Sequence, residues 1–250
     1  MFSSTEASAR GLEAHPAGAM LLPGFGRLVS RANLHGPNLQ LDHAVISGLD
    51  FRVLDVDFFD PKPFDGILGA AFLSNFDIDL DLSRSKLALF SPEHCGGKVV
   101  YWADQYLEEP LSIDPNGMMT IELELDGKKL TALLDTAVED TILSDQAAEA
   151  IFGIAPQPKA GWKRIPVIGN LIYLSSHSFL SLSIGGLKIH NPAIYQGNLP
   201  PLDSTYTVGN YGLTSETRPD IVLGLHELRL LHLYVSVSDR KIYFTPAAKS

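Results

Sequence analysis

Residues 220–245, "DIVLGLHELRLLHLYVSVSDRKIYFT", have a near copy earlier in the same chain. Residues 65–90, "DGILGAAFLSNFDIDLDLSRSKLALF", align with them without a gap at an offset of 155 residues. In this alignment Gly69 falls on Gly224, and the apolar residues on either side keep their places. Self-similarity at a fixed offset is the signature of a repeated structural unit. We therefore interpret the chain as two related copies of one unit.

Each copy has the same order of predicted elements. A short apolar strand ends at Gly69 or Gly224, and a brief helical turn follows it. Next comes a strand whose apolar residues alternate with others, the pattern of a half-buried β-strand. A polar turn, "SRS" or "SDR", then leads into a closing strand, "KLALF" or "KIYFT". In the first copy the alternating residues are Asp77, Ile78, Asp79, Leu80, Asp81 and Leu82.

The two copies differ in the length of sequence that precedes the repeat. Residues 2–12 align more weakly with residues 142–154, at an offset of 140. The second copy has two further predicted strands, "MTIELELDG" and "KLTALLDTA", within residues 119–137. The first copy has no counterpart of these strands. We predict a first lobe over residues 1–95, which lacks its opening strands, and a complete second lobe over residues 101–250.

Composition and charge exclude several classes of protein. The chain has 250 residues, 45% of them hydrophobic, and a formal net charge of −10. Nucleic-acid binding needs clustered Lys and Arg, so we expect no nucleic-acid partner. No apolar run reaches the roughly 18 residues of a membrane span, and the N-terminus has no signal-peptide pattern. A single cysteine, Cys95, excludes an internal disulfide.

Short motifs for metal and cofactor chemistry are missing from the sequence. There is no H-E-x-x-H, no paired C-x-x-C, no G-x-S-x-G and no phosphate-binding loop. His226 and His232 are six residues apart, which is not a spacing typical of metal ligands. We therefore expect neither a metal nor another cofactor.

The stretch "LLDTA", from Leu133 to Ala137, is the candidate for catalytic chemistry. Two apolar residues, Leu133 and Leu134, precede Asp135 and Thr136, and Ala137 follows. The residues alone leave three interpretations open: a catalytic aspartate, a disabled copy of one, or an acidic turn that ends a strand.

The "LLDTA" stretch, the "ILG" and "VLG" units and the repeated strand–helix–hairpin ends together resemble the retropepsin-like aspartic proteases. The resemblance covers nearly the whole chain, as a tandem two-lobed protein of bacterial type that is truncated at its N-terminus. It implies a mainly β fold of two acid-protease lobes, each a small closed barrel-like unit with short helices. In that family each lobe gives one Asp, from an Asp-Thr/Ser-Gly loop, to a shared cleft.

The resemblance also implies roles for individual residues. Asp135 matches the catalytic aspartate, and Thr136 and Ala137 match the residues that support its loop. Ala137 departs from the family pattern, in which a glycine packs closely and adopts unusual dihedral angles. Ile168 and Gly169 lie where the family has a flap over the substrate, although a plain hairpin glycine would give the same sequence.

The chemistry that this family performs needs two acids. Two carboxyl groups that lie close together share one proton, because both cannot ionise comfortably. The ionised group activates a water, and the protonated group polarises the peptide carbonyl. We therefore expect an aspartic-type peptidase acting on a peptide or protein, impaired by the truncation and by Ala137. The alternatives are an inactive peptide-binding or scaffold protein, and a homodimer in which two Asp135 loops face each other.

The offset of 140 places the counterpart of Asp135 six residues before Met1. We therefore expect Met1 to be an internal methionine of a longer reading frame that supplies the opening strands and a second acidic loop. The chain as written is expected to be soluble. Its localisation stays open, and a secreted or periplasmic parent protein fits the resemblance.

Overall fold

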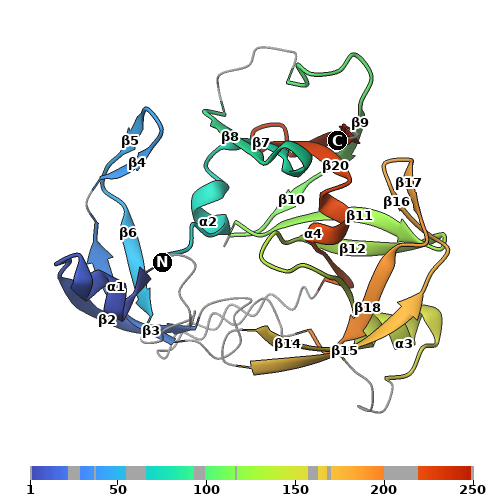
Figure 1. Ribbon diagram of the computed structural model, residues 1–250, viewed down its shortest axis with the longest axis horizontal. Helices are drawn as coiled ribbons and strands as arrows, with labels where there is room; N and C mark the ends of the chain where they lie inside the picture. The colour runs from blue at the N-terminus through green and yellow to red at the C-terminus, as the bar shows by residue number, and fades with distance from the viewer. Residues whose placement is uncertain are drawn as a thin grey trace. The chain divides into compact units, whose positions relative to one another are not determined.

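The computed structural model is mainly β (Figure 1). Two compact units divide the chain. The first comprises Met1–Gly69, Pro166–Leu171 and Pro200–Arg218, and the second comprises Ala70–Ile165, Ile172–Leu199 and Pro219–Ser250. The structure describes residues 2–21, 29–36, 38–54, 66–92, 99–115, 117–156, 163–167, 170–199 and 219–248.

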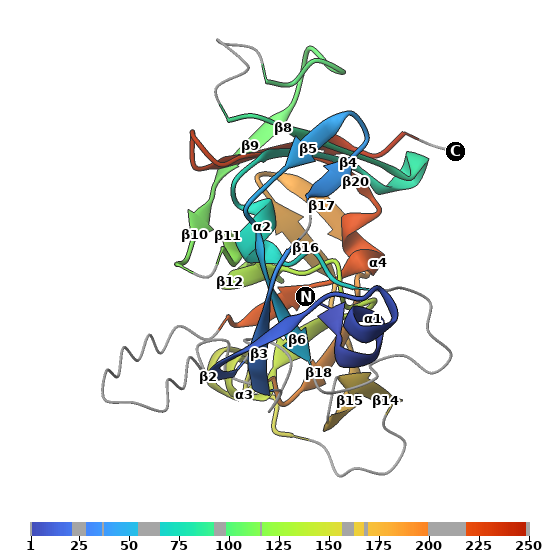
Figure 2. The same cartoon turned by 90° about the vertical axis from the view of Figure 1, so that its left-hand side faces the viewer.

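The first unit contains a four-stranded sheet in the order β1-β6-β3-β2 (Figure 2). A separate hairpin is formed by β4 and β5. Ala7 of the only helix described in this unit packs with Leu34, Phe51 and Val53 in a small core. The elements are β1 (Phe2–Ser3), α1 (Ser4–Ala9), β2 (Ala14–Leu21), β3 (Val29–His35), β4 (Leu39–Leu41), β5 (Ala44–Ile46) and β6 (Asp50–Leu54).

Most of the described elements belong to the second unit. The elements that precede Asp135 are α2 (Ala70–Leu73), β7 (Asp77–Asp81), the 3-10 turn η1 (Leu82–Arg84), β8 (Lys86–Phe90), β9 (Leu107–Pro110), β10 (Ser112–Ile113), β11 (Met119–Leu125) and β12 (Lys128–Leu134). The elements that follow it are β13 (Thr141–Ser144), α3 (Asp145–Phe152), β14 (Lys163–Val167), β15 (Asn170–Ser178), β16 (Ser181–Ile184), β17 (Leu187–His190), β18 (Ala193–Gly197), β19 (Ile221–Leu223), α4 (Leu225–Leu228), β20 (Leu231–Ser236) and β21 (Lys241–Pro246).

A ten-stranded sheet carries the start of the "LLDTA" stretch, whose Leu133 and Leu134 lie in β12. Its order is β14-β15-β18-β13-β19-β12-β11-β16-β17, with β10 paired to β11, and it curls into a half-barrel. Alternate residues of β11 are buried, as the period-two pattern predicts. The turn into β12 places Asp126 and Gly127 at φ 47° and 75°, which are left-handed conformations that suit a tight hairpin.

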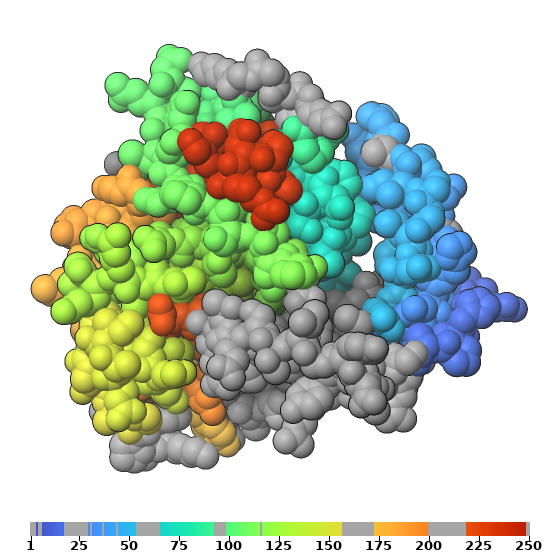
Figure 3. All heavy atoms as spheres, turned by 180° about the vertical axis from the view of Figure 1, so that it is seen from behind, coloured from blue at the N-terminus to red at the C-terminus, as the bar shows by residue number. Residues whose placement is uncertain are grey.

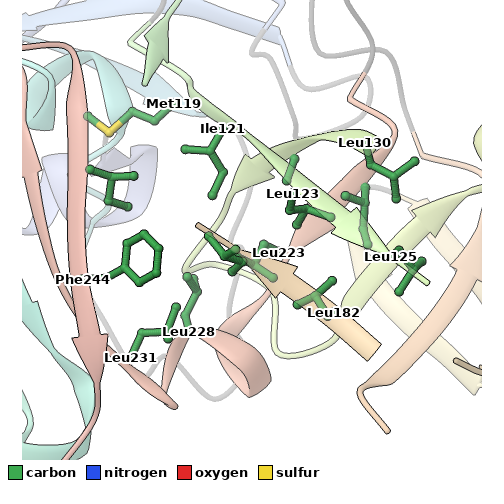
Figure 4. Close-up of a cluster of buried hydrophobic side chains, with 14 of the residues drawn as sticks. Met119, Ile121, Leu123, Leu125, Leu130, Leu182, Leu223, Leu228, Leu231 and Phe244 are labelled. Carbon is green, nitrogen blue, oxygen red and sulfur yellow. The ribbon is translucent and has the colours of Figure 1, made fainter. Parts of the chain in front are cut away.

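The main hydrophobic core lies between this sheet and the strands that follow it. Leu223 and Leu228 come from β19 and α4, and Leu231 and Phe244 come from β20 and β21 (Figure 4). They pack together with the buried row of β11: Met119, Ile121, Leu123 and Leu125. This core fixes the positions of β12 and β19, the two strands that lead to the candidate site.

A second sheet joins the two predicted copies of the repeat. Its order is β8-β7-β20-β21-β9, so the central strands β7 and β20 are counterparts in the repeat and pair antiparallel. In the space-filling view, the red C-terminal segment lies against green residues, in keeping with the pairing of β21 with β9 (Figure 3). The lobe boundaries at residues 95 and 101 stay a prediction.

The prediction that β7 is half-buried is wrong, because the acidic face of this strand is also buried. Asp77, Asp79 and Asp81 are at most 1% exposed. Val99 and Val100 are buried against Tyr234 and Tyr243 in a cluster on the second sheet. The acidic side chains stay in this environment because each has hydrogen-bond donors, as buried carboxylates require.

Asp79 lies at the centre of this acidic face. Its carboxylate accepts hydrogen bonds from Lys86 Nζ at 2.9 Å, from His232 Nε2 at 2.6 Å and from the Tyr101 hydroxyl. The His232 ring also stacks on Trp102, with the ring centroids 3.8 Å apart. Burial opposes ionisation of Asp79, but these hydrogen bonds outweigh it and hold the pKa of the carboxyl below its usual range.

Replacing Asp79 with asparagine should destabilise the protein by about 2–4 kcal/mol near neutral pH, because the hydrogen bonds from Lys86 and from the buried His232 lose their charged acceptor. The pKa of Asp79 is lowered in the folded state, so its stabilisation is present above the usual carboxyl pKa and is lost as the pH falls through the folded value. The variant should therefore lose less stability on acidification than the parent. Urea unfolding at neutral and acidic pH measures this, with Asp239→Asn on the exposed turn as the control. Equal pH dependence in parent and Asp79→Asn would contradict the assignment.

The predicted apolar strand at residues 67–69 is not a strand in the structure, although its counterpart β19 is. β19 pairs with β12 on one side and with β13 on the other. Short strands need partners for their backbone groups, and β19 has one on each side.

Candidate active site

Asp135 is the first residue after β12. Leu134, the last residue of that strand, pairs in parallel with Leu223 of β19. The Asp135 N–H continues this pairing and donates to the Leu223 carbonyl at 3.1 Å. This pairing holds the backbone of Asp135 at the end of β12, an interior strand of the sheet.

The loop after Asp135 is attached to the start of α4. The N–H groups of Leu225 and His226 donate to the Val138 and Glu139 carbonyls, each at 2.9 Å. Gly224, where β19 ends, lies directly against the same loop. A Cβ at this position would be 2.4 Å from the Asp140 carbonyl oxygen. The absence of a side chain at Gly224 therefore lets β19 pass close to this loop.

Side-chain contacts add to this attachment. Arg229 donates to both carboxylate oxygens of Glu139, at 2.6 and 3.3 Å. Asp220, at the start of β19, accepts from the Thr131 N–H at 2.8 Å. Asp220 therefore joins β19 to β12 and has a structural role.

The Asp135 carboxyl is half-buried, and one hydrogen bond holds it. The Ala137 N–H donates to Asp135 Oδ1 at 2.8 Å. Burial raises the pKa of the Asp135 carboxyl above its usual range, and the Ala137 hydrogen bond offsets only part of that effect. An acid with a raised pKa holds its proton in mildly acidic water, which is the property of a general acid.

The two residues that follow Asp135, Thr136 and Ala137, are exposed. Ala137 is not among the described non-glycine residues with a positive φ, so its backbone does not need glycine here. Its methyl group is exposed, and its N–H makes the only side-chain contact described for Asp135. The role predicted for Thr136, support of the loop through its hydroxyl, stays a prediction.

The predicted flap residues Ile168 and Gly169 lie outside the described residues. The strands on either side of them, β14 and β15, are neighbours in the ten-stranded sheet. A strand pair is therefore present where the flap is expected, and substrate contacts by Ile168 and Gly169 stay a prediction.

Two residues of the site carry no sequence motif. Glu227 of α4 is 0% exposed, and its Oε2 accepts a hydrogen bond from the Thr141 hydroxyl. The Thr141 oxygen in turn accepts from the Gly224 N–H at 3.0 Å. The sequence contains no clear signal for this pair, since Glu227 stands between His226 and Arg229 in a mixed polar and apolar stretch. Its partner, 86 residues away, could not be found from spacing.

Within the residues that the structure describes, no group of three or more His, Cys, Asp or Glu side chains could hold a metal ion. None of the helices in the same residues is long and apolar enough to cross a membrane.

Comparison with known proteins points to one family. A family model described as aspartyl protease matches residues 121–226. The search of curated proteins gives no match. Among solved structures, a retropepsin-like aspartic protease from Rickettsia conorii is 16% identical, with a TM-score of 0.38 over 59% of this chain and 98% of that one. Basic 7S globulin from soybean is 13% identical, with a TM-score of 0.46 over 100% of this chain and 81% of that one.

The matched segment contains the elements that build the site. It begins in β11, includes the Asp135 loop and the predicted flap, and ends in α4. Residues 121–226, 106 of the 250 residues, therefore match the aspartyl protease family model, and the chain has a mainly β fold.

Proposed function

We propose that the chain is an aspartic-type peptidase whose catalytic acid is Asp135. The observation that supports this most directly is the position of Asp135: a half-buried carboxyl of raised pKa at the end of a buried strand, within the segment that matches the family. The substrate would be a peptide or a protein.

The reaction requires a partner for Asp135. One carboxylate takes a proton from water as that water attacks the peptide carbonyl, and a second, protonated carboxyl donates a hydrogen bond to the carbonyl oxygen. The tetrahedral intermediate then collapses as the nitrogen of the leaving amine takes up a proton. In the described part of the chain, no second acidic group influences the Asp135 carboxyl.

The second acid in this proposal is Asp135 of a second copy of the chain. Two identical loops that face each other across a twofold axis would share one proton and titrate as a coupled pair. Such a site forms only in the dimer, so specific activity should rise with protein concentration.

Digestion of a defined peptide mixture tests the proposal. Peptides incubated with the purified chain at about pH 3–7, the range in which carboxyl pairs titrate, are analysed by mass spectrometry for new termini. We expect cleavage that pepstatin inhibits. No cleavage in this range, or cleavage that ignores pepstatin and persists in Asp135→Asn, would overturn the proposal.

Mixing experiments test the source of the second acid. Adding an excess of Asp135→Asn protein to the parent should lower parent activity, because mixed dimers contain only one acid. The matched control is an equal excess of Asp135→Asn protein that has been unfolded by heat. Activity that is independent of added variant and of protein concentration would show that Asp135 does not pair with its own copy.

The second candidate is a peptide-binding or scaffold protein without catalysis. Among the described residues no second acid contacts the Asp135 carboxyl, which favours this candidate because one carboxyl cannot divide the roles of acid and base. Binding of peptides without cleavage, unchanged in Asp135→Asn, is the result that this candidate predicts.

A further inference from the structure

The side chain of Glu227 is a buried acid that the proposed reaction does not use. It is 0% exposed and lies in the first turn of α4, between His226 and the buried Leu228. Its carboxylate has two described contacts: the Thr141 hydroxyl at Oε2, and His226 Nδ1 at 3.1 Å from Oε1. Burying an acid is costly unless its hydrogen bonds are made, so a buried acid at this place calls for an explanation.

The Thr141 hydroxyl connects Glu227 to the backbone that holds the candidate site. It donates its proton to the Glu227 carboxylate and accepts the Gly224 N–H at 3.0 Å. A hydroxyl has one proton to donate, so the acceptor at Glu227 fixes the direction of this chain of hydrogen bonds. With its proton committed to Glu227, the Thr141 oxygen presents its lone pairs to Gly224.

Gly224 is the point at which β19, α4 and the loop after Asp135 meet. The residue before it, Leu223, accepts the Asp135 N–H, and the residue after it, Leu225, donates to Val138. Movement of the Gly224 backbone would therefore displace both ends of the loop from Asp135 to Asp140. Residues that orient a reacting group through such contacts matter because small displacements reduce rates strongly.

We propose that Glu227 is a positioning residue for Asp135, acting through the Thr141 hydroxyl and the Gly224 N–H. This role of Glu227 rests on the proposed function, in which Asp135 is the catalytic acid. The physical claim, that this hydrogen-bond chain holds the Asp135 loop, stands whether or not the chain cleaves peptides.

Amide exchange and carboxyl titration of Thr141→Val test the proposal without any need for activity. Valine keeps the shape of threonine and removes the hydroxyl. We expect exchange of the Gly224, Leu225 and His226 amides to speed up by about tenfold, the effect of losing one hydrogen bond. The titration midpoint of the Asp135 carboxyl, followed by NMR, should move down toward its usual range as the loop opens to water.

The control is Thr245→Val, which removes another largely buried hydroxyl from the same unit. Thr245 Oγ1 accepts from Trp102 Nε1 at 3.0 Å, on the second sheet. This variant should leave the Asp135 titration and the three loop amides unchanged. Thr141→Ser, which restores the hydroxyl, should return both measurements to the parent values.

Glu227→Gln decides the matter if Thr141→Val does not fold. Glutamine keeps the size and one acceptor oxygen but loses the charge, so the loop amides should exchange about threefold faster, a smaller effect than full loss of a hydrogen bond. Unchanged loop exchange and an unchanged Asp135 titration in the folded variant would overturn the proposal. If the parent cleaves peptides, the same variant should lower kcat and leave KM unchanged. If the parent does not cleave them, the proposed function fails while the exchange and titration results still judge the role of Glu227.

Discussion

Asp135→Asn is expected to reduce peptide hydrolysis by about a thousandfold or more, because the amide can neither take a proton from water nor share one with a second acid. The change keeps the shape of the side chain and one oxygen to accept the Ala137 N–H, so the loop should keep its structure. Initial rates on one cleaved peptide, measured at several pH values, give the comparison. Turnover equal to that of the parent would show that another group performs the chemistry.

The same substitution should raise the stability of the protein near neutral pH. The pKa of Asp135 is raised in the folded state, so the folded protein holds this proton more tightly than the unfolded chain does. Stability is therefore lost as the pH rises from the usual carboxyl pKa through the folded value. Asparagine removes this loss, and we expect a gain of about 1 kcal/mol near neutral pH that disappears in acid. A lower Tm for the variant at neutral pH would contradict the burial of the Asp135 carboxyl.

Gly224→Ala should destabilise the protein by about 3 kcal/mol, the upper end of the range for overpacking. The new Cβ would lie 2.4 Å from the Asp140 carbonyl oxygen and 3.0 Å from that of Glu139. Both are backbone oxygens, so rotation of a side chain cannot relieve the clash. Because the φ of Gly224 is −89°, the effect is one of space and not of backbone conformation.

Gly127→Ala is the matched control for this prediction. Gly127 has φ 75° with open space around its Cβ position, so alanine there costs about 1 kcal/mol through conformation alone. Chemical denaturation of both variants separates the two effects. A Gly224→Ala variant no less stable than Gly127→Ala would contradict the close contact between β19 and the Asp135 loop.

Much of the fold could be predicted from local sequence. The β11–β12 hairpin follows from alternation and from the Asp126–Gly127 turn, and the hairpin β20–β21 follows from its match to the earlier copy. The burial of the β7 acids could not be predicted. Alternating apolar and acidic residues indicate a strand with one face exposed to solvent. His232 forms a hydrogen bond with Asp79, and Tyr234 forms one with Asp77. Both partners lie more than 150 residues further along the chain.

Only the part of the candidate site that carries a sequence motif, the Asp135 loop, could be predicted. Asp135 follows from its place after an apolar strand and from the resemblance of its surroundings to one family. Thr141 and Glu227 could not be predicted, because a threonine that starts a strand and an acid in a helical turn are ordinary in any sequence. Their role depends on a tertiary contact between β13 and α4, which the sequence does not encode as a spacing.

The central claim, that Asp135 is one of the two acids that act as water attacks a peptide carbonyl, is tested most directly on the Asp135 carboxyl itself. The carboxyl resonance is followed by NMR while pepstatin, whose hydroxyl imitates the tetrahedral intermediate, is added to the protein. The account predicts a shift of the Asp135 resonance and of its titration midpoint on binding, and loss of that binding in Asp135→Asn. Binding that leaves the Asp135 carboxyl unchanged, and that survives in Asp135→Asn, would contradict it.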